Sequence, residues 1–236
     1  MRNYSRSGIL HQQCWEVPGF IERKGEFYLI DEKRHYDQLI QCLKDMIVYR
    51  NIDSIQHIEY VQKYTRILAT EYAKLYPRSR MTEPKINIIV EAAGLHDIGK
   101  LALPDTVIGK KEKRSKSENI LMQQHTVRGS EMIGRLFEFR GEQFCRICRN
   151  VCLYHHEKYD GTGYPDKLRK DRIPIEAQLV GLADMYDTLL HNDQNNVFFT
   201  KEKAYYMLMK GECGMLSPRM KECFESAKTK MEGCCP

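Results

Sequence analysis

Apolar residues recur every three or four positions along most of the chain, which is the period of amphipathic α-helices. The first such stretch has apolar side chains at Tyr36, Leu39, Ile40, Leu43, Met46 and Ile47. The same period predicts helices over residues 54–75, 86–95, 117–139, 142–154, 175–190, 201–209 and 217–231. Pro77 ends the helix over 54–75, because proline lacks the backbone N–H that a helix interior needs. Alternating strand patterns are nearly absent, so the sequence predicts an all-α helical bundle.

The segments outside these helices set the expected domain limits. Residues 1–35 are irregular and carry Pro18 and Gly19. The stretch 26–30 resembles a strand, but we identify no convincing sheet partner for it, so residues 1–35 are interpreted as an N-terminal extension. Residues 36–231 form the predicted domain, and residues 232–236 form a C-terminal tail. Residues 102–116 and 160–165 are predicted to be loops.

Composition excludes several classes of partner. The 236 residues contain 37 Lys and Arg against 32 Asp and Glu, and a net charge of +5 is too small to indicate a DNA-binding protein. No segment reaches the roughly 18 apolar residues of a membrane-spanning helix, and the first 20 residues lack the apolar block of a signal peptide. We therefore expect a cytoplasmic protein without a membrane partner, whose nine cysteines are reduced. Cys145, Cys148 and Cys152 share one helix face, where a core role is favoured over a metal site.

The histidines carry more information than the charge. His125 follows His96 by 29 residues, His155 follows His125 by 30, and Asp184 follows His155 by 29. A spacing near 30 suits one helix, a turn and part of the next helix, so successive helices can return a ligand to a common centre. His11, His35 and His191 lack such a context and are expected on the surface.

Three local motifs contain residue types that bind metals. In Leu95-His-Asp-Ile-Gly-Lys100, an imidazole and a carboxylate at a helix end can converge on a cation, although an isolated pair is more often a cap or a surface pair. The second motif, Tyr154-His-His-Glu-Lys-Tyr-Asp-Gly-Thr-Gly-Tyr-Pro165, joins adjacent histidines to a glycine loop. The third places Asp184 in an apolar helix, where a buried carboxylate requires a partner such as a metal. Asp187 is either an outer support for such a site or a surface acid.

These motifs resemble the HD-GYP family, a branch of the HD superfamily of metal-dependent phosphohydrolases. His96-Asp97 matches the HD pair, Lys100 matches the lysine of the HDIGK motif, and Gly163-Tyr164-Pro165 matches the GYP signature. The similarity extends from about Leu39 to about Ala227.

The resemblance implies an HD-domain helical bundle and a set of metal ligands. The implied ligands are His57, His96, Asp97, His125, His155, His156 and Asp184. Many members place a glutamate, associated with a third metal, four residues before the first ligand histidine. Asp53 stands there in this chain, so we expect two divalent ions, with three as the alternative. Asp53 and His57 are expected on one helix face.

The resemblance also implies an activity. Members hydrolyse cyclic di-GMP, with a water or hydroxide bridging two divalent ions, and the family uses iron and manganese. Lys100 and Asp97 are the implied catalytic residues. Lys100, Gly163, Tyr164 and Pro165 are the implied substrate contacts. We therefore expect a metal-dependent phosphodiesterase acting on cyclic di-GMP or a related cyclic dinucleotide.

One segment departs from the family pattern. Where many members carry basic residues that contact substrate phosphate, this chain has Asp193 and Asn196. A reversed charge beside an anionic substrate is expected to weaken binding. The alternative function is therefore a catalytically weakened module that senses a cyclic dinucleotide or docks a signalling protein. A homodimer through the N-terminal helices is a further expectation.

Overall fold

The structure is a computed structural model, and it describes residues 20–23, 26–29, 32–110, 114–191 and 198–234. The chain divides into two compact units, residues 1–43 and 44–236. Apart from one hairpin, the regular elements are helices, so the predicted all-α class is confirmed.

The hairpin corrects one expectation. Strand β2 (Glu26–Leu29) does have a sheet partner, strand β1 (Phe20–Arg23), and the two are antiparallel with Phe20 opposite Leu29. The partner lies immediately before β2, with only Lys24 and Gly25 between them in the sequence. A two-residue connection containing glycine is a common hairpin signal.

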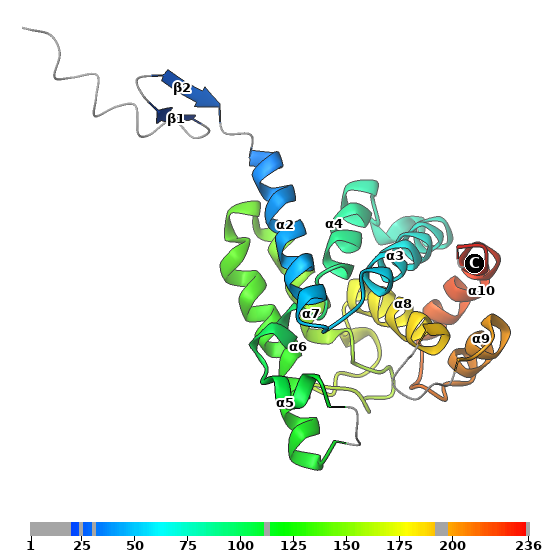
Figure 1. Cartoon of the computed structure of the whole chain (residues 1–236). Coiled ribbons are helices and arrows are strands. Elements are labelled where there is room, and N and C mark those ends of the chain that lie inside the picture. Colours follow the sequence, from blue (N-terminus) through cyan, green and yellow to red (C-terminus); the bar gives the residue numbers. More distant parts are fainter. Residues whose placement is uncertain (1–19, 24–25, 30–31, 111–113, 192–197, 235–236) are drawn as a thin grey trace, which may run out of the picture. The chain divides into compact units, whose positions relative to one another are not determined.

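The helices begin and end close to the predicted limits (Figure 1). They are α2 (Glu32–Tyr49), α3 (Ile55–Leu75), α4 (Glu83–Ala93), α5 (Asp105–Ile108), α6 (Lys116–Leu136), α7 (Glu142–Tyr154), α8 (Ile175–His191), α9 (Lys201–Lys210) and α10 (Pro218–Glu232). Two differences from the prediction concern the region of the HD motif and the segment after it. The apolar helix α4 ends at Ala93, and the His96-Asp97 pair lies in turns before a 3₁₀ helix, Ile98–Ala102. The predicted loop 102–116 contains the short helix α5.

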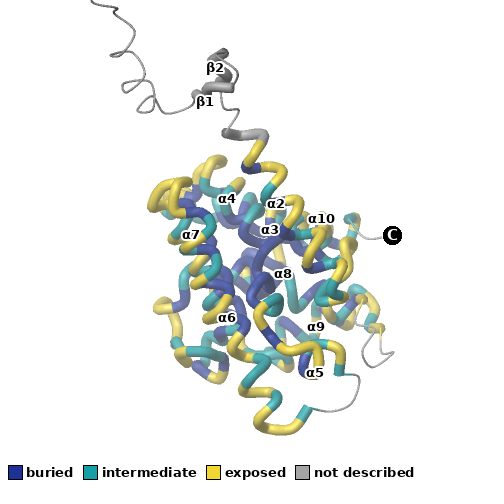
Figure 2. The backbone as a smooth tube through the Cα atoms, turned by 60° about the vertical axis from the view of Figure 1, so that its left-hand side comes forward, coloured by how far each residue is buried: buried dark blue, intermediate teal, exposed yellow. Residues whose placement is uncertain are grey.

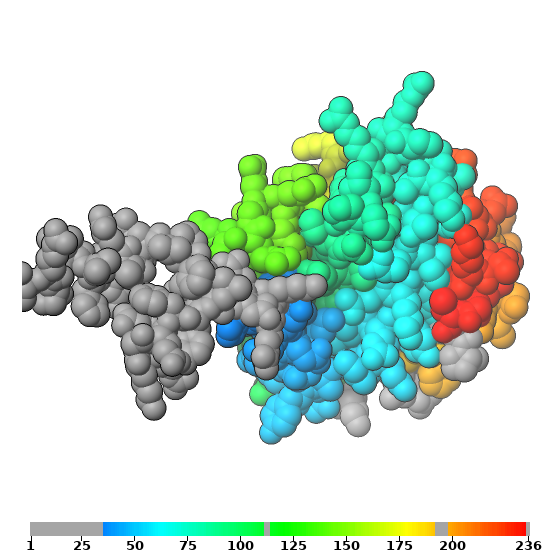
Figure 3. Space-filling view, turned by 90° about the horizontal axis from the view of Figure 1, so that it is seen from above, coloured from blue at the N-terminus to red at the C-terminus, as the bar shows by residue number. Residues whose placement is uncertain are grey.

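Helix α3 is central to the second unit. Val61, Tyr64 and Leu68 of α3 are fully buried, and the helix packs against α8, α4 and α10 (Figure 2). Figure 3 shows the α3 surface lying between those of α4 and α10. Helix α7 packs against α6, α4 and α8. Helices α3, α4, α7 and α8 therefore pack together in the second unit.

The cysteines of α7 belong to this packing. Cys148 and Cys152 are fully buried, and the Cys152 thiol donates to the backbone oxygen of Leu95 at 3.5 Å. Among the described residues, neither group suited to a metal contains a cysteine. The apolar face of α7 is therefore core, as its spacing suggested.

Candidate metal centre

The fold brings seven of the eight predicted ligands into two groups. The first group is Asp97, His125, His155 and His156, and the second is His57, His96 and Asp184. Within each group, the ligand atoms lie within 4.8 Å of one another. The side chains come from α3, the turn after α4, α6, the end of α7, and α8.

Three buried histidines are oriented by the backbone of their own turns. The Nδ1 atoms of His96, His125 and His155 lie 2.8, 2.7 and 2.9 Å from the backbone oxygens of Ala93, Met122 and Val151. Since a carbonyl oxygen can only accept, Nδ1 donates its hydrogen, and in the neutral ring Nε2 keeps a lone pair.

The inward-facing atoms lack partners. The Nε2 atoms of these three histidines and Oδ1 of Asp97 are buried, and within the described part of the chain they have no hydrogen bond. Buried polar atoms are nearly always satisfied, and divalent cations bound between these side chains would satisfy them. The donor set therefore fits a metal.

Asp97 faces both groups. Its Oδ1 lies 3.1 Å from His125 Nε2 and 3.9 Å from His155 Nε2, and its Oδ2 lies 3.3 Å from His96 Nε2. Two atoms that each ligate one ion at about 2.1 Å are separated by about 3.0 to 3.4 Å. Each carboxylate oxygen thus faces the histidines of a different group, so Asp97 would be the residue shared between two bound ions.

Helix α8 carries the predicted ligand Asp184 and a second carboxylate, Asp187, beside His57. His57 Nε2 lies 3.5 Å from Asp184 Oδ1, while His57 Nδ1 lies 2.7 Å from Asp187 Oδ2. Asp187 is buried, so it is not a surface acid and instead holds the ring of His57. His191 is exposed, as predicted, and its Nδ1 lies 2.9 Å from Asp187 Oδ1 while its ring stacks on Tyr60.

Burial and nearby charges set the protonation of the ligands. Burial, reinforced by His96 and His125, lowers the pKa of His155 to about 3. Burial also opposes a charge on His96, but the carboxylates of Asp97 and Asp184 outweigh it and raise the pKa of His96 to about 10. The carboxylates therefore favour a positive charge at this point, and a divalent ion would supply it in place of the proton.

Lys100 and Asp53 form the edge of the centre. Lys100 Nζ lies 2.5 Å from Asp97 Oδ2 and 3.8 Å from Asp53 Oδ1. Burial would lower the pKa of Lys100, but these carboxylates raise it, so the lysine stays charged. Asp53 lies outside both ligand groups. The predicted shared helix face of Asp53 and His57 is wrong, because α3 begins at Ile55 and Ser54 is its N-cap.

The GYP loop lies against the first ligand group. A side chain at Gly163 would overlap the backbone of His156 and Glu157, so this close approach requires glycine. The Tyr164 ring lies 4.7 Å from the ring of His156. Tyr164 lines a cavity of about 160 Å³ together with Lys100, His125 and His156. Pro165 follows Tyr164 through a cis peptide bond.

Sequence analysis assigned no role to Glu157, although the residue stands between the HH and GYP motifs. Its carboxylate is buried and accepts the backbone N–H groups of Asp166 and Leu168 at 2.8 and 3.0 Å. Glu157 therefore fixes the chain just after Pro165. Its acidic type was visible in the motif, but its backbone partners were not.

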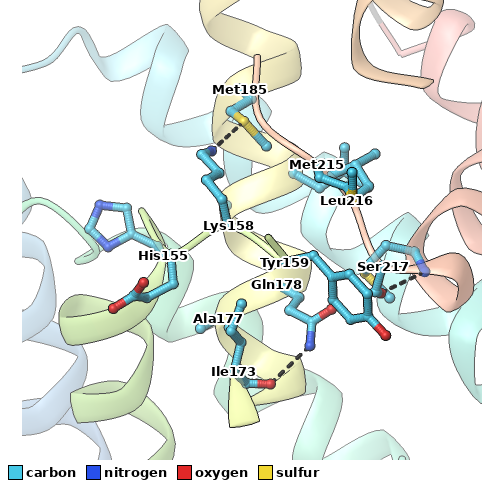
Figure 4. A pocket seen from close by; sticks show the side chains of 14 residues that line it. His155, Lys158, Tyr159, Ile173, Ala177, Gln178, Met185, Met215, Leu216 and Ser217 are labelled. Carbon is cyan, nitrogen blue, oxygen red and sulfur yellow. Dashed lines mark hydrogen bonds between the residues drawn. The ribbon is translucent and has the colours of Figure 1, made fainter. Parts of the chain in front are cut away.

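A second, smaller cavity is lined by His155, Lys158 and Met185 among other residues. It measures about 20 Å³, and Figure 4 shows Lys158 reaching into it toward Met185. Lys158 Nζ lies 2.7 Å from the Met185 sulfur, and burial lowers the pKa of this lysine. The space is large enough for about one water molecule and not for a nucleotide.

Two predictions lie outside the described residues. They are the placement of His11 and the effect of Asp193 and Asn196 on substrate binding. In the described part of the chain, no helix combines the length and hydrophobicity that crossing a membrane requires.

Several known proteins are similar to this chain in sequence. A family model described as HD domain matches residues 42–211. A cyclic di-GMP phosphodiesterase of Vibrio cholerae is 32% identical over 197 residues, covering 82% of this chain and 40% of that protein. The cyclic di-GMP phosphodiesterase response regulator RpfG of Xanthomonas campestris is 34% identical over 157 residues, covering 66% of this chain and 40% of that protein. A 3'3'-cGAMP-specific phosphodiesterase of Vibrio cholerae is 30% identical over 161 residues, covering 68% of this chain and 29% of that protein. The chain thus spans between about a third and a half of the length of such relatives.

A solved structure supports the fold. The HD-GYP-type protein Bd1817 of Bdellovibrio bacteriovorus aligns with a TM-score of 0.54 at 18% identity, covering 82% of this chain and 63% of that one. Together with the His96-Asp97 and Gly163-Tyr164-Pro165 motifs, these similarities show that the chain belongs to the HD domain family, in its HD-GYP branch.

Proposed function

We propose that this chain is a metal-dependent phosphodiesterase that hydrolyses cyclic di-GMP or a related cyclic dinucleotide. The observation that carries the proposal is the pair of ligand groups joined by Asp97, with unsatisfied Nε2 atoms directed inward and a cavity beside them. The relatives named for cyclic di-GMP and for 3'3'-cGAMP support this substrate class.

In this proposal, different residues bind the metal ions and the substrate. The two ligand groups would hold two divalent ions, with Asp97 shared between them. Mixed imidazole and carboxylate donors suit iron or manganese. Bound ions supply a water of lowered pKa and offset the negative charge of the phosphate. Lys100 stays cationic at the cavity wall, where it attracts a non-bridging phosphate oxygen, and Tyr164 of the GYP loop bounds the space for the substrate.

A reconstitution assay tests the proposal. Protein loaded anaerobically with Fe(II) or Mn(II) is expected to hydrolyse cyclic di-GMP or 3'3'-cGAMP to linear products. The double variant His96→Ala with Asp97→Ala is expected to abolish the reaction, while the control His35→Ala, at an exposed histidine far along the chain from the motifs, retains it. The acidic and neutral residues Asp193 and Asn196 favour the alternative of a cyclic-dinucleotide sensor. Binding of a cyclic dinucleotide without hydrolysis would support the sensor function. If the protein neither binds nor hydrolyses a cyclic dinucleotide, a protein-docking module is the function that remains.

A further inference from the structure

A second basic residue shares the cavity at the metal centre. Arg114 lines the 160 Å³ space together with Lys100, His125, His156 and Tyr164. It therefore faces the same space as two members of the first ligand group. No role was predicted for this arginine, which stands in the predicted loop 102–116.

The local structure holds Arg114 in place. Arg114 directly precedes Ser115, the N-cap of α6. The Ser115 hydroxyl accepts from Glu118 N at 3.3 Å, and the Glu118 carboxylate accepts from Ser115 N at 2.7 Å, which forms a capping box. On the other side, Arg114 Nε donates to the backbone oxygen of Val107 at 3.1 Å. The guanidinium is thus attached to α5 at one nitrogen.

Among the described residues, no acidic side chain pairs with Arg114. Three other basic side chains in this region have acidic partners: Lys100 pairs with Asp97, Arg50 with Asp105, and Lys110 with Glu118. For the Arg114 side chain, the Val107 oxygen is the sole hydrogen-bond partner in the described part of the chain, and no carboxylate there pairs with the guanidinium. Its two terminal nitrogens are therefore available to an anion. A guanidinium with two donors side by side matches two oxygens of a phosphate.

We propose that Arg114 is a substrate-positioning residue that binds a phosphate of the cyclic dinucleotide at the mouth of the metal centre. The inference rests on the proposed function. It gives the substrate a cationic contact from the start of α6, on a segment other than the one that contains Asp193 and Asn196. Because Arg114 touches neither ligand group by a hydrogen bond, its removal is expected to weaken substrate binding and to leave the ions in place.

The test compares Arg114→Gln and Arg114→Lys with the control Arg128→Gln in the metal-loaded full chain. Arg128 lies on the exposed face of α6 and bonds to Gln124, so its loss removes the same charge outside the cavity. We expect Arg114→Gln to raise the KM for cyclic di-GMP, or for 3'3'-cGAMP if that is the better substrate, about tenfold. The kcat is expected to change by less than about threefold. Arg114→Lys is expected to recover part of the loss, since it keeps the charge, and Arg128→Gln to match the wild type.

Two further readouts separate this role from a structural one. The dissociation constant for a hydrolysis-resistant phosphorothioate analogue, measured by calorimetry, is expected to rise in parallel with KM, while bound metal and the melting temperature stay unchanged. If Arg114→Gln and the wild type bind the analogue equally, the role of Arg114 is overturned and the proposed function stands. Equal losses in the Lys and Gln variants, with a lowered melting temperature, would also overturn it. A wild type that neither binds nor hydrolyses any cyclic dinucleotide would overturn both proposals.

Discussion

Each of three buried histidines at the centre has one ring nitrogen bound to a backbone oxygen of its own turn. His57 differs, because its Nδ1 faces the carboxylate of Asp187, which adds negative charge as well as orientation. The sequence alone could not predict that a carboxylate, and not a backbone oxygen, is the partner of His57 Nδ1. The position of Asp187, three residues after Asp184, allowed both a supporting and a surface role, and only the packing of α8 on α3 selects between them.

Asp187→Asn is expected to weaken metal binding at the group of His57, His96 and Asp184. The amide keeps the shape of the side chain but loses the charge that supports His57, and such losses reduce metal affinity about 10- to 100-fold. Metal content after dialysis against a weak chelator measures the effect. His191→Ala removes the exposed partner of Asp187 and serves as the control. An unchanged affinity in Asp187→Asn would show that Asp187 does not support the ligand.

Glycines allow the elements around the centre to approach closely. A Cβ on Gly181 of α8 would overlap the backbone oxygen of His155, and one on Gly99 would overlap that of His125. Element limits were predictable where a cap or a breaker marks them, as at Ser54 and Pro77. A helix limit was not predictable where apolar residues continue past a turn, as after Gly94. There, periodicity cannot distinguish a helix from a buried turn. The one-turn helix α5 is too short to show a period.

Gly181→Ala is expected to destabilise the protein by about 2 to 4 kcal/mol, because the added methyl group forces α8 away from the end of α7. The matched helical control is Gly134→Ala, whose Cβ would meet nothing closer than Arg149 Cδ at 3.5 Å. That substitution is expected to be neutral or stabilising by up to about 1 kcal/mol. Urea unfolding followed by circular dichroism measures both. Equal effects of the two substitutions would refute the close contact at Gly181.

At the scale of the whole molecule, contacts between residues distant in sequence form the metal centre and hold the helices together. The spacings near 30 predicted that the ligands converge, but they could not predict the division into two groups, which depends on how the helices pack. Glu71 of α3 shows the same limit away from the centre. It is buried and bonds to Lys230 and Ser226 of α10 as well as to Lys74.

This cluster predicts a pH dependence of stability. The hydrogen bond from Lys230, helped by those from Lys74 and Ser226, lowers the pKa of Glu71 from 4.5 to about 2. A lowered carboxyl pKa stabilises the fold fully above about pH 4.5, and the contribution is lost as the pH falls to about 2. Glu71→Gln is therefore expected to lower the free energy of unfolding by about 1 to 2 kcal/mol at pH 7. The effect is modest because Lys74 and Lys230 are half exposed, so solvent weakens their interaction with Glu71. Near pH 2 the substitution is expected to have no effect. Urea unfolding at both pH values measures the difference in unfolding free energy between the wild type and Glu71→Gln. A difference that stays constant between pH 7 and pH 2 would contradict this prediction.

The central claim is that the seven ligands hold two ions joined by Asp97, and anomalous X-ray diffraction from crystals of the metal-loaded protein tests it most directly. We predict two peaks at the absorption edge of the bound metal. One is expected among Asp97, His125, His155 and His156, and the other among His57, His96 and Asp184, with an Asp97 oxygen on each. A single peak, or peaks away from these side chains, would contradict the account.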